Sequence, residues 1–172
     1  MTLSAKLAGA VLLLGSASVL GAELNIKLQI PRLEVAEYHR PYIAVWVENQ
    51  DQSTAAQLAV WYQTDPRKED GTQWLKDLRQ WWRRGGRELD MPIDGVTGAT
   101  RPVGEHVLRF KSTDKQLARL APGKYNVVVE ATREVGGREL LRLPFVWPAT
   151  QKQQATAKGK TELGAVTLNV TP

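Results

Sequence analysis

The stretch at 121–148, APGKYNVVVEATREVGGRELLRLPFVWP, decides the fold class. A Pro-Gly turn opens it, and a valine-rich run typical of a β-strand continues over 121–134. Gly136 and Gly137 reverse the chain into a second strand over 138–148. We therefore expect a β-hairpin with two long arms.

Strand patterns also occur on both sides of this hairpin. Apolar and polar residues alternate in ELNIKLQI at 23–30, which predicts a half-buried strand. Further strands are expected over 41–49, 56–64, 105–112 and 161–170, and a hairpin loop over 50–55 joins the first two of these. About seven strands predict an all-β immunoglobulin-like or fibronectin-like sandwich, in a single domain over 23–172.

One element breaks the strand pattern. The segment 72–84 has the apolar spacing of an amphipathic helix, with four large residues on one face: Trp74, Leu78, Trp81 and Trp82. Thr72 or Asp70 can cap the start of this helix, and Gly85 can end it. An irregular, motif-bearing loop is expected over 85–104, and the polar, low-complexity segment 149–160 is expected to be a mobile loop.

The N-terminus is typical of an export signal. Lys6 precedes an apolar, small-residue run over 7–22, so we expect a signal peptide over 1–22 with cleavage near Ala22; the alternative is an uncleaved membrane anchor. We therefore expect a periplasmic protein with no stable membrane insertion after cleavage. The formal net charge of +5 falls by one with Lys6, and the basic residues are mostly scattered, so no nucleic-acid partner is expected.

Composition restricts the possible chemistry. The chain has no cysteine, which excludes disulfides, iron–sulfur clusters, c-type haem attachment and a cysteine nucleophile. Two histidines and two methionines supply few metal ligands, and no metal site is predicted. The sequence also lacks a dinucleotide-binding G-x-G-x-x-G, a Walker loop and a G-x-S-x-G elbow, so no catalytic residue is assigned. Any redox function would need a cofactor brought in from outside.

The segment DGVTGAT at 94–100 is the strongest candidate for a functional site. Thr100 offers a hydroxyl, and Gly98 and Ala99 before it are small, so the backbone can be approached closely. Thr97 adds a second hydroxyl and Asp94 a carboxylate. Such a loop can enter the active site of a modifying enzyme, although Asp-Gly is also an ordinary turn signal.

This segment resembles the acceptor motif of the periplasmic flavin transferase, Asp-x-x-Ser/Thr-Gly-Ala-Thr/Ser. That enzyme uses FAD and Mg²⁺ to place FMN on the last threonine through a phosphoester bond. The sequence here matches the motif at each specified position. The resemblance therefore implies covalent FMN on Thr100, with the flavin transferase as a partner.

A second resemblance covers most of the mature chain. RPYIAVWVEN, WLKDLRQWWR, DGVTGATRPVG, PGKYNVVVEATREVGGRE and ELGAVTLNV are similar to an uncharacterised periplasmic domain family of unknown function. Its members are often encoded beside the flavin transferase and PepSY-type membrane proteins. The resemblance implies a flavoprotein that exchanges electrons with a PepSY-type or other membrane redox partner, rather than a stand-alone enzyme.

Three residues around Thr100 each have two alternative roles. Asp94 is either read by the transferase or caps the local turn, and Thr97 is expected to hydrogen-bond within the turn. Arg101 either offsets the phosphate charge of FMN or is a solvated loop residue. His106 either handles a proton near the flavin or is structural.

Aromatic and basic side chains of the inserted helix are candidates for contacts with the flavin ring. Trp82 is expected to be the tryptophan most available for stacking, whereas Trp74 and Trp81 are expected to seat the helix on the sandwich. Arg83, Arg84 and Arg87 can meet phosphate or complement the helix dipole.

Two functions from different classes follow. The first is periplasmic electron transfer by covalently bound FMN. The alternative is a non-redox β-sandwich binding module that docks a membrane or cell-envelope partner through its tryptophan-rich helix.

Overall fold

The computed structural model describes residues 21–172, so the predicted signal peptide lies almost entirely outside the described residues. Nine strands and three short helical segments are present over that range. The strands are β1 (Glu23–Ile30), β2 (Tyr42–Glu48), β3 (Thr54–Tyr62), β4 (Thr97–Ala99), β5 (Gly104–Lys111), β6 (Gly123–Thr132), β7 (Arg138–Trp147), β8 (Gln153–Lys158) and β9 (Ala165–Thr171). The helical segments are η1 (Gly71–Asp77), α1 (Arg79–Arg83) and η2 (Gly86–Glu88).

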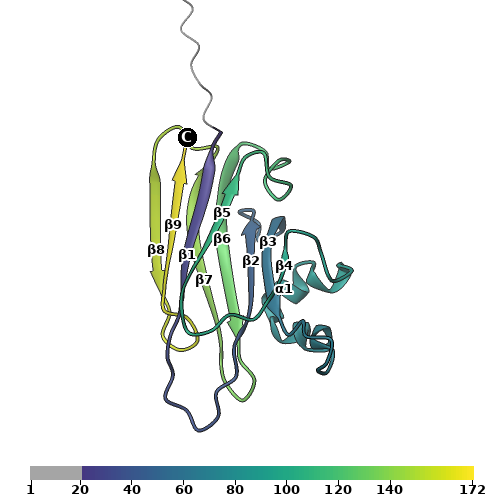
Figure 1. Ribbon diagram of the computed structural model, residues 1–172. Coiled ribbons are helices and arrows are strands. Elements are labelled where there is room, and N and C mark those ends of the chain that lie inside the picture. Colours follow the sequence, from purple (N-terminus) through teal and green to yellow (C-terminus); the bar gives the residue numbers. More distant parts are fainter. Residues whose placement is uncertain (1–20) are drawn as a thin grey trace, which may run out of the picture.

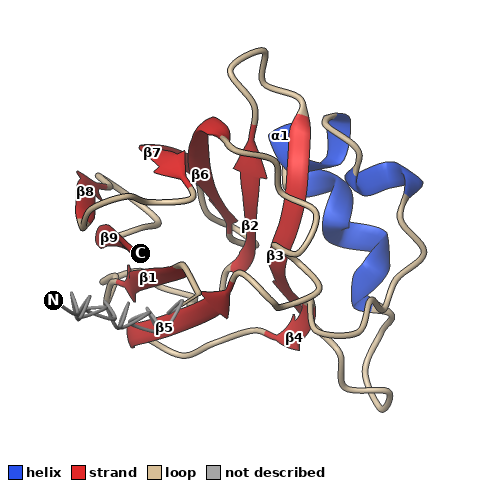
Figure 2. Cartoon of the chain, turned by 90° about the horizontal axis from the view of Figure 1, so that it is seen from above, coloured by secondary structure: helices blue, strands red, loops and turns tan. Residues whose placement is uncertain are grey.

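The strands form two sheets that face each other, which confirms the predicted β-sandwich (Figure 1). One sheet has the order β5-β1-β9-β8, and the other has the order β4-β3-β2-β6-β7. All pairings are antiparallel except that of β3 with β4, which is parallel. The helical segments cover the outer face of the five-stranded sheet, opposite the four-stranded sheet (Figure 2).

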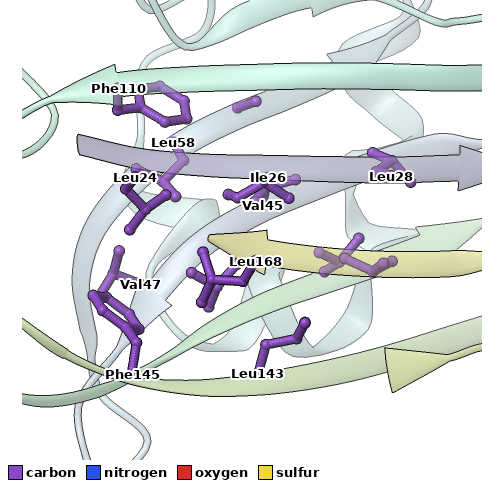
Figure 3. Packing of buried hydrophobic residues seen from close by; sticks show 14 of the residues in the cluster. Leu24, Ile26, Leu28, Val45, Val47, Leu58, Phe110, Leu143, Phe145 and Leu168 are labelled. Carbon is purple, nitrogen blue, oxygen red and sulfur yellow. The ribbon is translucent and has the colours of Figure 1, made fainter. Parts of the chain in front are cut away.

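The main core lies between the two sheets. Every second residue of β1, from Leu24 to Ile30, is fully buried, as the alternating sequence predicts. These side chains meet Val45 and Val47 of the opposite sheet, and Phe145 packs beside them (Figure 3). A second apolar cluster on the outer face holds the helical segments; its fully or nearly buried members include Trp46, Leu75, Leu78 and Trp81.

The hairpin that decides the fold is present with long, regular pairing. β6 and β7 pair from Gly123 opposite Trp147 to Thr132 opposite Arg138, without a register shift. The expected hairpin of β2 and β3 also forms, with two register irregularities. Both of these predictions are therefore confirmed.

The predicted number of strands, about seven, is too low. The segment 149–160 was expected to be a mobile loop, but 153–158 forms the edge strand β8. Its residues alternate between half-buried and exposed, and Ala155 and Ala157 pack against the core. Because alanine is a weak strand former, the period-two pattern is easily overlooked in this polar segment. The other missed strand is β4.

The predicted helix over 72–84 is also wrong in its form. Residues 71–77 form a 3₁₀ helix, and Leu78, at φ −74° and ψ 69°, separates it from the five-residue α1. Three residues complete each turn of a 3₁₀ helix, so Leu75 and Leu78 share the buried side. This shift rotates Trp74 away from the face that α-helical spacing assigns to it.

The sequence predicts surface ion pairs for Glu130, Arg133 and Glu134, but two of these three residues are buried. Glu130 is fully buried; its carboxylate accepts hydrogen bonds from the backbone N–H groups of Gln80 and Trp81 at 3.0 and 2.8 Å. The same carboxylate accepts a bond from Arg138 at 2.9 Å. Arg133 is buried as well, and only Glu134 is exposed. A residue that directly follows three valines on β6 thus holds the first turn of α1 on the sheet.

Candidate functional site

The predicted motif loop contains a strand. Thr97–Ala99 forms β4, which runs parallel to β3 at the edge of the five-stranded sheet, so an irregular structure throughout 85–104 is wrong. Just beyond the strand, the backbone N–H of Thr100 donates to the carbonyl of Tyr62 at 3.1 Å. The sheet therefore fixes the backbone of the proposed acceptor residue.

A tight turn leads into β4. The Ile93 carbonyl accepts hydrogen bonds from the N–H groups of Val96 and Thr97, at 3.1 and 2.9 Å. The Ile93 N–H in turn donates to Thr97 Oγ1 at 2.8 Å, which is the hydrogen bond within the turn expected of Thr97. Burial raises the pKa of the neighbouring Tyr62, and a hydrogen bond with Thr97 partly opposes that rise. Thr97 thus closes the turn and faces Tyr62.

Asp94 is not the cap of this turn. Its carboxylate lies on the surface and accepts a hydrogen bond from Lys115 Nζ at 2.6 Å. That bond, together with the positive charge of Lys115, lowers the pKa of Asp94. The side chain of Gln116 also donates to the Gly95 carbonyl at 2.7 Å. The start of the motif is therefore attached to the segment that follows β5.

Gly98 is required by packing inside the protein. A Cβ atom at this position would lie 2.9 Å from Cδ1 of Trp61, the residue paired with it on β3. Since Trp61 is almost fully buried in the main core, its ring has little room to move away. The glycine thus allows β4 to approach β3, besides leaving the motif unobstructed for an enzyme.

Arg101 and His106 both lie against the Trp61 ring. The Arg101 guanidinium carbon is 5.2 Å from the ring centroid, a cation–π distance, and the His106 ring meets Trp61 edge-on at 5.8 Å. His106 Nε2 is 2.8 Å from the Pro102 carbonyl. Sequence reasoning missed Trp61, because a tryptophan in an apolar strand is usually a core residue.

The burial of the three tryptophans in the inserted segment differs in part from the prediction. Trp81 is 1% exposed and belongs to the outer-face cluster, as expected. Trp74, also expected in the core, is 44% exposed, so that prediction is wrong. Trp82 is half-buried and packs on Trp81 at 6.3 Å and on the outer-face cluster. No hydrogen bond joins Trp82 to Thr100 within residues 21–172.

The three arginines that end the inserted segment make local contacts. Arg83 bonds to Gln80, Arg84 to Gln52, and Arg87 to Glu88. Each of these arginines is exposed, and within residues 21–172 none is hydrogen-bonded to the motif.

The resulting geometry places Thr100 just beyond a strand at the edge of the sheet. Ala99 is exposed and Thr100 is half-buried, while Arg101 beside them is an exposed cation. β4 has a neighbour in the sheet on one side only. Such an edge suits covalent modification by another enzyme, because the modifying active site can reach it without opening the sandwich.

The comparisons with known proteins agree with the expected location. Residues 23–165 match a family described as "Predicted periplasmic protein (DUF2271)", which confirms the periplasmic location expected from the sequence. No curated protein and no solved structure matches the chain. Within the described part of the chain, no helix has the length and apolar character needed to cross a membrane. Because the match covers most of the sequence, the chain belongs to this family of predicted periplasmic proteins of unknown function.

Proposed function

We propose that this protein carries FMN, joined through a phosphoester to Thr100, and transfers electrons in the periplasm. The observation that carries the proposal is the complete acceptor motif on an open sheet edge, with the Thr100 backbone held by Tyr62. In the modification, the Thr100 hydroxyl oxygen attacks the FMN phosphorus of FAD. A new P–O bond forms, the bond to the AMP phosphate breaks, and AMP leaves while the hydroxyl proton passes to a base.

Arg101 is suited to the charge that this reaction leaves behind. The phosphodiester on Thr100 carries one negative charge, and the exposed guanidinium of the next residue can approach it. Arg101 forms no ion pair with another residue of the described chain, and its present contact is the Trp61 ring. Moving from the ring to the phosphate would cost Arg101 no salt bridge.

Electron transfer then depends on the flavin rather than on titratable groups of the chain. A bound flavin accepts and donates one or two electrons, and the protein supplies its position and electrostatic surroundings. A PepSY-type or other membrane redox protein is the partner that we propose.

The test is the intact mass of the exported protein after co-expression with a flavin transferase. We expect a gain of one FMN residue in the wild type and no gain in Thr100→Ala. Thr97→Ser, which keeps a hydroxyl in the turn, is the matched control and should still gain FMN. An unchanged wild-type mass, with a transferase that modifies a proven acceptor, would exclude the proposal.

The exposed Trp74 favours the second candidate function, a non-redox module that binds a cell-envelope partner, because tryptophan is enriched at binding interfaces. A preparation from the native host separates the two. Yellow protein whose flavin survives denaturation supports the flavin carrier, whereas colourless protein supports the binding module.

A further inference from the structure

A cavity of about 470 Å³ lies away from the Thr100 edge. It opens between η1 and the turn that joins β6 to β7, and we call it the hairpin cavity. The residues that matter to its chemistry are Arg40, Tyr42, Trp74, Arg79, Arg133 and Arg138. Its volume falls in the range of sites that bind small organic molecules.

An exposed aromatic ring stands at this cavity. Trp74 is 44% exposed, whereas Trp81 in the same segment is 1% exposed. Tyr42 contributes a second aromatic side chain from β2. Lys76 Nζ lies 5.5 Å from the Trp74 ring centroid, so this flexible side chain covers one face of the ring. The part of the ring that stays exposed is accessible to a flat ligand.

The polar lining of the cavity is rich in hydrogen-bond donors held in place. Arg138 is bonded to the buried carboxylate of Glu130, and Arg133 is bonded to the buried carboxylate of Glu162 at 2.8 and 3.2 Å. A guanidinium group only donates hydrogen bonds, so a ligand must bring acceptors. These fixed donors are preorganised, which lowers the entropic cost of binding.

The charge of the cavity is balanced. Arg40 and Arg79 form no ion pair with another residue between 21 and 172, but the carboxylates of Asp77 and Glu134 line the same cavity. The other two arginines are neutralised by the carboxylates beneath them. Neutral acceptors such as ring carbonyls therefore fit this lining better than a multiply charged anion does.

Arg133 has one donor without a partner. Its side chain is 6% exposed, and its Nη1 is buried without a hydrogen-bond partner in the described chain. Gly136 lies directly on the guanidinium, since a Cβ there would be 2.5 Å from Cζ. The turn next to it holds Val135 at φ 51°, a strained conformation for a β-branched residue, and leaves it 75% exposed. This donor belongs to a residue that lines the cavity, so a ligand carbonyl that reached it would satisfy it.

We infer that the hairpin cavity binds a planar ring that carries carbonyl oxygens, stacked on Trp74 and hydrogen-bonded by the surrounding arginines. An isoalloxazine has this chemistry, and it has two possible sources. One is flavin attached to Thr100 of the same chain, which rests on the proposed function. The other is a flavin or similar ring brought by a separate molecule.

The first source is compatible with the sheet topology. Thr100 is bonded to Tyr62, whose ring lies 6.3 Å from that of Tyr42, and Tyr42 lines the cavity. Three strand spacings, about 14 Å, separate β4 from β6 across this end of the sheet.

The cavity itself is tested with the Thr100→Ala protein and riboflavin, which has the ring but no phosphate. We expect saturable binding, followed by flavin fluorescence or equilibrium dialysis, that weakens about tenfold in Trp74→Ala and in Arg79→Gln. Both side chains are exposed, so these variants should fold. Arg119→Gln, at an exposed arginine outside the cavity, is the matched control and should bind riboflavin as tightly as the parent protein.

Three outcomes would overturn the inference. They are no saturable binding, binding that both cavity variants leave unchanged, and FMN binding far more tightly than riboflavin, which would assign recognition to the phosphate. None of these outcomes affects the intact-mass test. The inference about the cavity and the proposal that FMN is attached to Thr100 can therefore be excluded independently of each other.

The two sources are separated with flavinylated wild-type protein. If the attached flavin fills the hairpin cavity, added riboflavin no longer binds, and Trp74→Ala changes the fluorescence of the attached flavin. If riboflavin binds equally well with and without attached FMN, the ring comes from a separate molecule.

Discussion

The edge strand β4 and the hairpin cavity belong to the same sheet but are built in opposite ways. β4 consists of small residues, and it is held by backbone pairing and by contact with Trp61. The cavity is lined by arginines and aromatic rings, and buried carboxylates hold two of those arginines. An attachment point needs access from outside, whereas a ring-binding site needs donors fixed before the ligand arrives.

The two regions also differ in the kind of substitution that destabilises them most. Buried ion pairs are costly to break because the remaining charge stays buried, whereas a strand of small residues is sensitive mainly to added volume. Variants that remove charge at one region and add volume at the other should therefore separate them. The largest effect is expected at the cavity, and the smallest at the exposed start of the motif.

The largest effect is expected from Glu130→Gln. The carboxylate accepts bonds from Gln80, Trp81 and Arg138, so an amide would place an N–H₂ group against at least one donor. We expect the free energy of unfolding to fall by about 3 kcal/mol, measured by urea denaturation. Glu88→Gln, in an exposed pair with Arg87, is the control and should change it little. If both variants lower the free energy of unfolding equally little, the bonds of Glu130 do not stabilise this side of the cavity.

A smaller effect is expected from Gly98→Ala on the edge strand. The added Cβ meets the buried Trp61 ring, and forcing it in should cost about 1–3 kcal/mol of unfolding free energy. Ala99→Ser, one residue along at an exposed position, should cost about 0.5 kcal/mol or less. If the two variants are equally stable, the Trp61 ring moves aside for the added methyl group more easily than its burial implies.

The smallest effect on stability is expected from Asp94→Asn, because Asp94 and its partner Lys115 are both exposed. If the transferase reads the carboxylate directly, flavin transfer should slow about tenfold, the loss of one charge-assisted hydrogen bond. The Lys115→Gln protein should then accept flavin at the wild-type rate. Equal slowing in both variants would show instead that the pair only positions the motif.

The pH dependence of this pair has a defined window. The bond from Lys115 lowers the pKa of Asp94 in the folded protein. The stabilisation that the Asp94 carboxylate contributes is therefore complete above pH 3.8, and it is lost as the pH falls through the lower pKa of the folded state. The pKa of Lys115 is raised by the same bond, so its contribution is complete below 10.5 and is lost as pH rises through the higher folded value. The effect of Asp94→Asn on transfer should therefore be constant between pH 5 and pH 9, where a transfer-rate profile can check it.

The strands that the sequence revealed are those with a strong apolar pattern. β1 alternates cleanly, and β6 carries a run of valines, so both could be recognised from periodicity alone. β8 escaped because its inward residues are Ala155 and Ala157, whose small side chains give little contrast with their polar neighbours. β4 escaped because a run of three residues that includes a glycine is too short to show a period-two pattern; its pairing depends on a partner far away in sequence.

The candidate site was predictable only as a motif. The residues of DGVTGAT could be listed, but the parallel pairing with β3 and the contact of Gly98 with Trp61 depend on segments about 35 residues away. The hairpin cavity was not predicted at all. Its arginines come from three separate segments, and the exposure of Trp74 follows from a 3₁₀ turn where α-helical spacing was expected.

The sequence by itself determined the two-layer β architecture, the long hairpin of β6 and β7, and the presence of the motif around Thr100, because hydrophobic periodicity and turn residues are local properties. Tertiary structure alone decided that the motif is an edge strand, that Glu130 is buried beneath α1, and that Trp74 faces a cavity. Those outcomes depend on which distant side chains fill the space beside each residue, and burial of that kind is not encoded in any single stretch of the chain.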